Sequence, residues 1–399
     1  MELLSLVYYN TFMPNCSGVC VNKCTVQRRS SMECRKRGGV QVAGVAARPV
    51  QVDLSASDTS KEGSIKWGWV GIQGPRTEME DAIVLRVDGL NNFTYAAVFD
   101  GHAGFASAKF LKDELYKECA IALQDGLLLE SNDLGATREA LRKAFIETDR
   151  KLISWLEEVN DGVDSGSTAT VMFVGGGRLI ISHIGDSSVV LSRSGKPMEI
   201  TSAHRPYGNS KVSLDEIRRI KAAGGWVTNG RICGDISVSR AFGDMRFKTK
   251  MKDMLEEGIR EGKWTGKFAS RIKLNGDWVT AIPDIYHADL GPDIEFIIVA
   301  SDGLWDCMNS SDAVKFVRSQ LRQHRDVQCA CEALANAALK RNTQDNVSII
   351  IADFGRVPQE DGPEKEQNFG SEIVQATATV GIVTLGIWLS SLVGQELGR

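Results

Sequence analysis

The chain has 399 residues, of which 43% are hydrophobic and 25% are charged, and its formal net charge at pH 7 is −4. This composition predicts a folded globular protein, with enough residues for one large core or two ordinary ones, and excludes a chain that is disordered throughout. A nucleic-acid-binding protein needs a basic surface, so the charge balance argues against nucleic acid as a partner.

Residues 1–50 differ in composition from the rest of the chain. They are rich in Ser, Val, Cys and Arg, and their basic residues outnumber the acids Glu2 and Glu33. Basic, hydroxylated segments with few acids are typical of organelle transit peptides, which is our interpretation of this leader. A plain disordered tail is the alternative.

Residues 59–355 have the patterning of a globular domain. Apolar residues at helical spacing, together with a capping box at Ser213 and Glu216, predict helices over Thr137–Val159, from Ser213 to about Gly224, over Ser311–Gln323 and over Val327–Lys340. Strand-like runs include Gly166–Val174, Arg178–Ile184 and Ser188–Arg193. Clusters of strands separated by helix pairs predict an α+β sandwich with antiparallel sheets. The charged, glycine-interrupted residues 246–277 are interpreted as a surface insertion suited to contacting a partner.

Acidic residues occur where apolar runs end or begin. Residues 93–99 lead into Asp100-Gly101, and residues 294–300 lead into Ser301-Asp302. Two other apolar runs start just after Glu80-Asp81 and Asp345-Asn346. In an antiparallel sheet the end of one strand lies beside the start of its neighbour, so we expect these carboxylates to meet at one rim. Repelling carboxylates of this kind predict a site for hard divalent cations.

The C-terminal region divides into two parts. Residues 356–372 form a polar, acidic linker, and residues 373–395 carry no charge. About 20 apolar residues are needed to cross a bilayer of about 30 Å, and small residues are common in membrane helices, so we predict a transmembrane anchor over residues 373–395. An amphipathic helix that docks on the globular body is the alternative.

Seven sequence blocks, taken in order over about residues 65–354, resemble the type 2C metal-dependent Ser/Thr protein phosphatases. Any one block is weak evidence, but the ordered set is highly specific. The blocks are Arg76…Glu80-Asp81, Val98–His102, Ser165–Ala169, Gly185–Ser187, Ser237–Asp244, Ser301–Asp306 and Asp345–Val347.

The resemblance implies a four-layer α-β-β-α sandwich with two central antiparallel sheets and two Mn²⁺ or Mg²⁺ ions at its edge. Asp100 would bridge the two ions. The Gly101 carbonyl and, through water, Glu80 would serve one ion, whereas Asp302 and Asp345 would hold the other. The two cations would activate a water molecule for in-line attack on a phosphoserine or phosphothreonine phosphorus.

Three further roles follow from the same resemblance. Asp186 would help to hold a third, weaker ion. Arg76 would bind the substrate phosphate, because a guanidinium binds phosphate in a bidentate manner, although a surface salt bridge to Glu78 or Glu80 is the alternative. His102 would protonate the leaving alkoxide, and its alternative is a core histidine behind the metal ligands.

The sequence departs from the family pattern near the third ion and beside His102. The usual Gly-His-Gly-Gly reads Gly101-His102-Ala103-Gly104 here, and the usual Asp-His-Lys-Pro reads Ala203-His204-Arg205-Pro206. His183 and Ser188 stand where the family has Asn and Arg. These changes affect the surroundings of the third ion and leave the two-ion centre complete.

An organelle leader combined with a C-terminal anchor resembles the layout of thylakoid-associated plant members of the family, which act on the phosphorylated light-harvesting antenna of photosystem II. The resemblance implies a chloroplast transit peptide and a single-pass thylakoid protein with its catalytic domain on the stromal side. We expect a monomer whose partners are phosphorylated membrane antenna proteins. The alternatives are the same activity at another organelle membrane, and a non-catalytic phosphoprotein-binding pseudophosphatase.

Overall fold

The computed structural model describes residues 65–131, 133–159 and 164–358. The predicted leader (1–50), the predicted anchor (373–395) and nearly all of the acidic linker lie outside these ranges. Within them, none of the helices combines the length and apolar character that a bilayer span requires.

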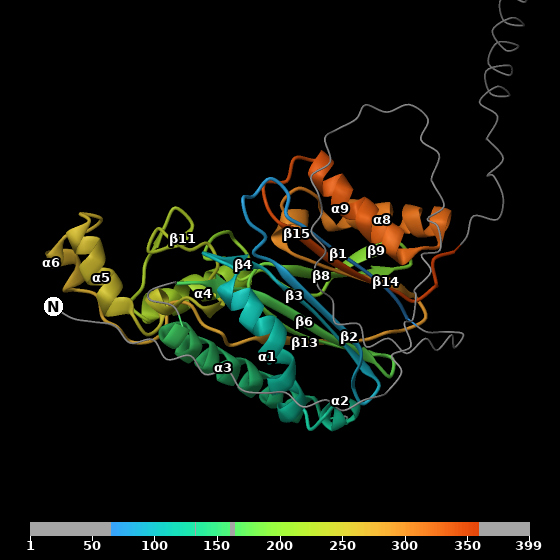
Figure 1. Ribbon diagram of the computed structural model, residues 1–399, viewed down its shortest axis with the longest axis horizontal. Coiled ribbons are helices and arrows are strands. Elements are labelled where there is room, and N and C mark those ends of the chain that lie inside the picture. The colour runs from blue at the N-terminus through green and yellow to red at the C-terminus, as the bar shows by residue number, and fades with distance from the viewer. Residues whose placement is uncertain (1–64, 132, 160–163, 359–399) are drawn as a thin grey trace, which may run out of the picture. The chain divides into compact units, whose positions relative to one another are not determined.

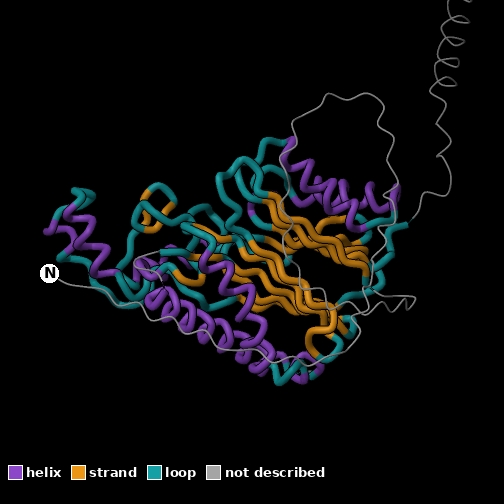
Figure 2. Tube along the Cα trace, viewed as in Figure 1, coloured by secondary structure: helices purple, strands orange, loops and turns teal. Residues whose placement is uncertain are grey.

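Two antiparallel five-stranded sheets form the centre of the described structure (Figure 2). The first sheet consists, in spatial order, of β1 (Lys66–Ile72), β15 (Val347–Asp353), β14 (Ile294–Ala300), β8 (Ser188–Arg193) and β9 (Lys196–Glu199). The second consists of β13 (Asp284–Asp289), β7 (Arg178–Ile184), β6 (Ala169–Gly175), β3 (Phe93–Phe99) and β2 (Ala82–Leu90).

The strands that carry the site are buried on both faces, which explains why their sequences are continuously apolar. In β15, Ile350 and Ala352 pack between the two sheets, whereas Ile349 and Ile351 pack beneath the helices that cover the first sheet. Successive side chains of a strand point to opposite faces, so a strand that is covered on both sides needs apolar residues at every position.

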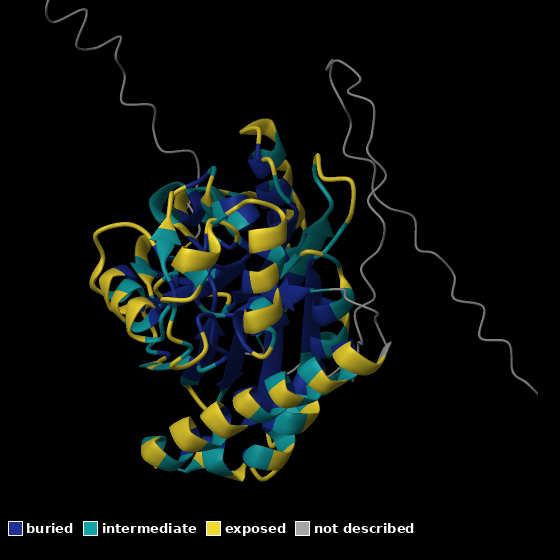
Figure 3. Ribbon diagram, turned by 90° about the vertical axis from the view of Figure 1, so that its left-hand side faces the viewer, coloured by how far each residue is buried: buried dark blue, intermediate teal, exposed yellow. Residues whose placement is uncertain are grey.

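Helices cover the outer face of each sheet (Figure 1). The first sheet is covered by α8 (Ser310–His324) and α9 (Val327–Lys340), and the second by α1 (Ala106–Ala122) and α3 (Leu134–Val159). Their inward faces are buried and their outward faces are exposed (Figure 3). The four layers are therefore helices, sheet, sheet and helices, which confirms the predicted α-β-β-α sandwich.

The predicted capping box at Ser213 and Glu216 is wrong. The helix α4 covers Lys211–Ala222, and its N-cap is Ser210, whose side chain accepts a hydrogen bond from the Ser213 backbone N–H. Glu216 is buried and accepts from Arg240 rather than from the helix terminus. A buried carboxylate needs a cationic partner, and this requirement outweighs local capping.

The remaining short elements lie mostly beside the site. They are β4 (Gly101–His102), β5 (Gly166–Ser167), β10 (Val227–Thr228), β11 (Arg231–Ile232), β12 (Phe242–Gly243), the 3₁₀ helix η1 (Met245–Phe247), α2 (Leu127–Glu130), α5 (Met251–Arg260), α6 (Gly266–Ala269) and α7 (Asp302–Trp305). Figure 1 shows α5 and α6 projecting beyond the sheets.

Residues 246–277 are only partly the surface insertion that the charge pattern predicts. Met251, Met254 and Leu255 of α5 are buried in a separate apolar cluster around Trp278. The ring of Trp226 contacts the rings of Trp264 and Trp278 edge-on. The charged residues of this segment lie partly on α5, an amphipathic helix that buries its apolar face and exposes its charged face. The number of charges alone therefore did not indicate the buried side.

Candidate active site

The predicted site residues meet at one edge of the sandwich. They line a cavity of about 350 Å³, and its walls include Arg76, Glu80, Asp100, Gly101, His102, Asp186, Asp302 and Asp345. Carboxylate oxygens of Asp100, Asp186 and Asp302 lie within 4.8 Å of one another. The antiparallel register explains this convergence, because Ala82 pairs with Phe99 and Ala300 pairs with Ile349, so the acids that flank these strands fall at the same edge.

The carboxylates at this edge are held in an electrostatically unfavourable state. Burial, followed by repulsion from neighbouring carboxylates, raises the pKa of both Asp100 and Asp302 well above the usual range. Burial and the charges of Asp345 and Glu80 also raise the pKa of Asp81 to about 7. Within the described residues, Asp81 Oδ2 is buried and makes no hydrogen bond. Oxygen donors in this arrangement fit hard divalent cations.

The loop that carries Glu80 is tied to the turn at Asp345-Asn346. The Glu80 backbone N–H donates to Asn346 Oδ1 at 2.8 Å, and Asn346 Nδ2 donates to the carbonyls of Gln73 and Glu78. Gly101 is required here, because a Cβ at this position would lie 2.3 Å from the Glu80 carbonyl oxygen. Asn346 is therefore a positioning residue, a role that its place in the block Asp345–Val347 did not reveal.

Arg76 lies at the mouth of the cavity with a half-exposed side chain. Its Nη2 is 2.5 Å from Asp345 Oδ2, and its Nε donates to the Gln344 carbonyl at 3.1 Å. The alternative expectation of a salt bridge to Glu78 or Glu80 is not what the structure shows, because the partner is Asp345. The guanidinium is at the site, and phosphate binding by Arg76 stays a prediction.

His102 forms an ion pair with Asp244, a residue whose role the sequence reasoning missed. His102 Nε2 lies 2.9 Å and 3.0 Å from the two carboxylate oxygens of Asp244. The small sheet β12-β5-β4 brings them together, because both His102 and Gly243 pair with Gly166. A Cβ at Gly166 would lie 2.2 Å from His102 Nε2, so only glycine leaves room for this contact.

The ion pair sets the protonation state of His102. Burial lowers the pKa of the imidazole, but the charge of Asp244 and the hydrogen bond to it outweigh burial and raise the pKa above its ordinary value. The imidazolium form is therefore favoured. The available signal in the sequence was that Asp244 closes the block Ser237–Asp244.

Behind Asp244 lies a buried ion pair that no pattern in the sequence indicated. Lys248 is 4% exposed, and its Nζ donates to both carboxylate oxygens of Asp149, at 2.8 Å and 2.7 Å. Asp149 Oδ1 also accepts from the Gly243 backbone N–H at 2.9 Å. This pair fixes the backbone that places Asp244 beside His102.

Comparison with known proteins agrees with this geometry. A family model described as Protein phosphatase 2C matches residues 66–347. The chain belongs to this family. It is therefore a metal-dependent Ser/Thr protein phosphatase.

Individual family members resemble the chain over most of its length. Protein phosphatase 2C 57 of Arabidopsis thaliana is 58% identical over 328 residues, which cover 82% of this chain and 84% of that protein. Probable protein phosphatase 2C 69 of the same plant is 30% identical, over 76% of this chain and 74% of that protein. A crystal structure of serine-threonine phosphatase 2C from Toxoplasma gondii superposes with a TM-score of 0.57 at 20% identity, covering 74% of this chain and 96% of that one, which supports the fold alone.

One departure from the phosphatase 2C pattern is expected to cost stability. Ala103 has a φ of 55°, and a non-glycine residue in this left-handed region costs roughly 1–2 kcal/mol. Ala103→Gly relieves that cost but gives the unfolded chain more entropy, about 0.4–1 kcal/mol, so we expect a net stabilisation of about 0.5–1 kcal/mol. Urea unfolding of the metal-free protein measures this change in the free energy of unfolding.

A glycine substitution without this strain serves as the control. Ala140→Gly, within α3, should destabilise the protein by about 1 kcal/mol, as glycine does in helix interiors. If Ala103→Gly also destabilised the protein, the strain at residue 103 would be disproved.

Proposed function

We propose that this phosphatase hydrolyses phosphothreonine and phosphoserine in light-harvesting antenna proteins at the thylakoid membrane, using two Mn²⁺ or Mg²⁺ ions. The catalytic part of the proposal rests on one observation, the convergence of Asp100 and Asp302 in a cavity that Arg76 and His102 also line. A pseudophosphatase is disfavoured because every carboxylate expected at the two-ion centre is present.

The residues at the edge of the sheets would form two sets of ligands, one for each ion. Asp100 would bridge them, the Gly101 carbonyl and Glu80 would serve one, and Asp302 and Asp345 would hold the other. When bound, the pair of ions supplies an activated water nucleophile and positive charge opposite the phosphate oxygens.

In this proposal Arg76 binds the substrate phosphate and His102 donates a proton to the leaving group. A phosphoserine or phosphothreonine carries about −1.5 to −2 charges at neutral pH. The half-exposed Arg76 guanidinium can release Asp345 and bind two oxygens of the substrate phosphate instead. His102 acts as the general acid toward the leaving serine or threonine oxygen. Because Nε2 is held by Asp244, the proton passes from Nδ1.

The location rests on the composition of the two terminal regions. The basic leader of residues 1–50 is typical of import into an organelle, and the uncharged residues 373–395 have the length of a bilayer span. In this proposal the catalytic domain lies on the stromal side of the membrane. A fluorescent protein fused after the leader tests this directly, and exclusion from plastids would end the antenna assignment.

Deleting all residues after Gln375 is expected to release the protein from membranes without loss of peptide hydrolysis. The full-length chain should sediment with membranes after a high-salt wash, because an apolar anchor is insensitive to ionic screening. The truncated chain should remain in the supernatant. Sedimentation of the truncated chain under the same wash would show that the membrane contact lies elsewhere.

The substrate is tested on phosphorylated thylakoids. We expect the purified protein with Mn²⁺ to remove phosphothreonine signal from the antenna bands, and a chelator to block the loss. If other phosphoproteins were dephosphorylated while the antenna bands persisted, the enzyme assignment would stand and the antenna assignment would fall.

A further inference from the structure

The position expected for a third ion already contains a cation of the chain. Arg205 lies in the loop between β9 and α4, and its guanidinium is surrounded by three carboxylates. Arg205 Nε donates to Asp186 Oδ2 at 2.7 Å, and Nη2 lies 3.2 Å from Asp302 Oδ2 and 3.1 Å from Asp306 Oδ1. The Asp186 side chain is 5% exposed and that of Arg205 is 22% exposed, so the contact between them is largely shielded from water.

The backbone next to both residues holds this ion pair in place. The His204 N–H donates to the Gly185 carbonyl at 2.8 Å, and the Gly185 N–H donates to His204 Nδ1 at 3.2 Å. These bonds join the residue before Arg205 to the residue before Asp186. The guanidinium is therefore pre-organised toward Asp186 rather than free to swing into solvent.

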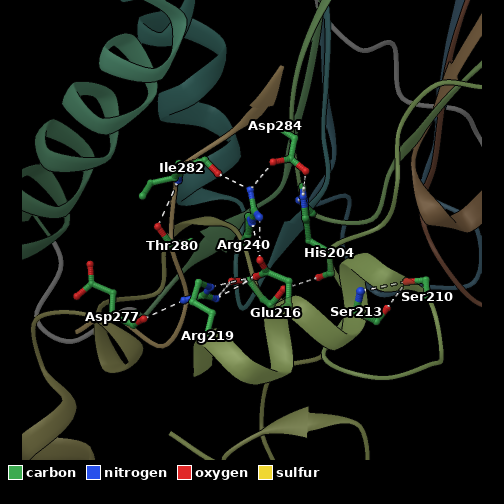
Figure 4. A network of polar contacts seen from close by, with 12 residues as sticks. His204, Ser210, Ser213, Glu216, Arg219, Arg240, Asp277, Thr280, Ile282 and Asp284 are labelled. Atoms are coloured by element: carbon green, nitrogen blue, oxygen red, sulfur yellow. Dashed lines mark hydrogen bonds and ion pairs between the residues drawn. The ribbon is translucent and has the colours of Figure 1, made fainter. Parts of the chain in front are cut away.

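His204 is itself anchored in a wider network. Its Nε2 lies 3.1 Å from Asp284 Oδ2, and Asp284 Oδ1 accepts from Arg240 at 2.8 Å. Figure 4 shows this network continuing from Arg240 to the buried Glu216 of α4. Arg205 thus projects from a loop that is fixed on the side away from the metal ligands.

The positive charge of Arg205 beside Asp186 does not depend on pH. A guanidinium keeps its charge at every pH at which the protein is folded, and it offers several N–H donors in a rigid plane. A third divalent ion would need oxygens of Asp186 and Asp302, which Arg205 already engages. It would also have to approach a fixed positive charge at contact distance, where repulsion is strong. The residues present therefore do not fit the third ion that the family pattern implied.

We propose that Arg205 takes the place of a third metal ion, so that this phosphatase binds two catalytic ions and neutralises Asp186 with its own side chain. The inference rests on the two-ion centre of the proposed function. Arg205 is a positioning residue in this account: it orients Asp302 toward the two metal ions and supplies the positive charge that a third metal ion would bring.

The test counts Mn²⁺ ions bound by the full-length protein, from the electron paramagnetic resonance signal of free Mn²⁺ during a titration. We expect two bound ions in the wild type and in Asp186→Asn, because Asp186 is already neutralised by Arg205. Arg205→Ala should bind three ions, with the added one weaker than the others. Combining Arg205→Ala with Asp186→Asn should return the number to two.

Two further variants separate the guanidinium from general disturbance. Arg205→Lys restores the lysine of the family pattern and removes the planar fork that engages Asp186 and Asp302 together, so it should bind three ions. Arg218→Ala removes a guanidinium that is 73% exposed on α4 and should bind two. Circular dichroism checks that each variant is folded.

The number of Mn²⁺ ions bound by the wild type tests the proposal even if Arg205→Ala does not fold. Three ions in an active wild type, or the loss of one ion in Asp186→Asn, would overturn this inference and leave the phosphatase assignment intact. The same number of ions in wild type and folded Arg205→Ala would also overturn it. A wild type that binds no Mn²⁺ would overturn the two-ion centre as well.

Discussion

Asp100→Asn is expected to lower kcat/KM toward a phosphothreonine peptide by roughly 1000-fold, even at saturating Mn²⁺. Charge stabilisation by bound metal ions is worth several kcal/mol in a transition state, and a loss of about 4 kcal/mol corresponds to a factor of about 1000. Asp302→Asn should have a comparable effect, since Asp302 lies in the same group of carboxylates.

The same substitution should make the metal-free protein more stable. Burial and the surrounding carboxylates raise the pKa of Asp100 in the folded chain, so the ionised group opposes folding at neutral pH. The pKa is higher in the folded state, so the destabilisation is absent below the unfolded value of 3.8 and grows as the pH rises above it. Asparagine carries no charge, and the gain in Tm should therefore be present near neutrality and vanish in acid.

These opposite changes distinguish a metal ligand from a structural residue. Asp293→Asn is the control, because Asp293 lies on the surface in an exposed pair with Arg193, where a change is worth within about 0.5 kcal/mol. A fall in both activity and metal-free stability would assign Asp100 a structural role. Undiminished activity at saturating Mn²⁺ would remove it from the metal centre.

His102→Gln should reduce kcat by about 10²–10⁴-fold on a phosphothreonine peptide, the usual contribution of a general acid. The serine or threonine alkoxide is a strong base and needs a proton as it leaves. A nitrophenolate is a weak base, so hydrolysis of p-nitrophenyl phosphate should decrease far less. An equal decrease on both substrates would contradict proton donation and favour a role in holding the metal ligands.

Asp244→Asn tests how the acid is kept protonated. The raised pKa means that imidazolium is present below that pKa and is lost as the pH rises through it, so activity should fall on the alkaline side of the profile. Asparagine keeps an oxygen for Nε2 but removes the charge. The alkaline limb of kcat/KM for the peptide should therefore move to lower pH. A limb that stays in place would show that Asp244 does not control the titration of His102.

The gathering of carboxylates at one edge of the sandwich was predictable from the sequence, because it follows from where the acids stand relative to the apolar runs. Asp100 and Asp302 each follow a continuous apolar run, and Asp81 and Asp345 each precede one. Antiparallel pairing brings such positions to one edge whatever the loops between them do. Clusters of strands separated by helix pairs likewise indicated an α+β sandwich, and the family resemblance implied its four layers.

Partnerships between side chains on distant loops were decided only by the tertiary structure. The pairing of His102 with Asp244 depends on three short strands, and the approach of Arg205 to Asp186 depends on hydrogen bonds between Gly185 and His204. Neither has a periodicity that a sequence can display. The position of Lys248 was equally unpredictable. A lysine in a charged stretch normally indicates a solvent-exposed side chain, but Lys248 is buried against Asp149. Apolar periodicity records which face of an element is covered, whereas the choice of partner for a charge depends on where loop packing leaves an unneutralised carboxylate.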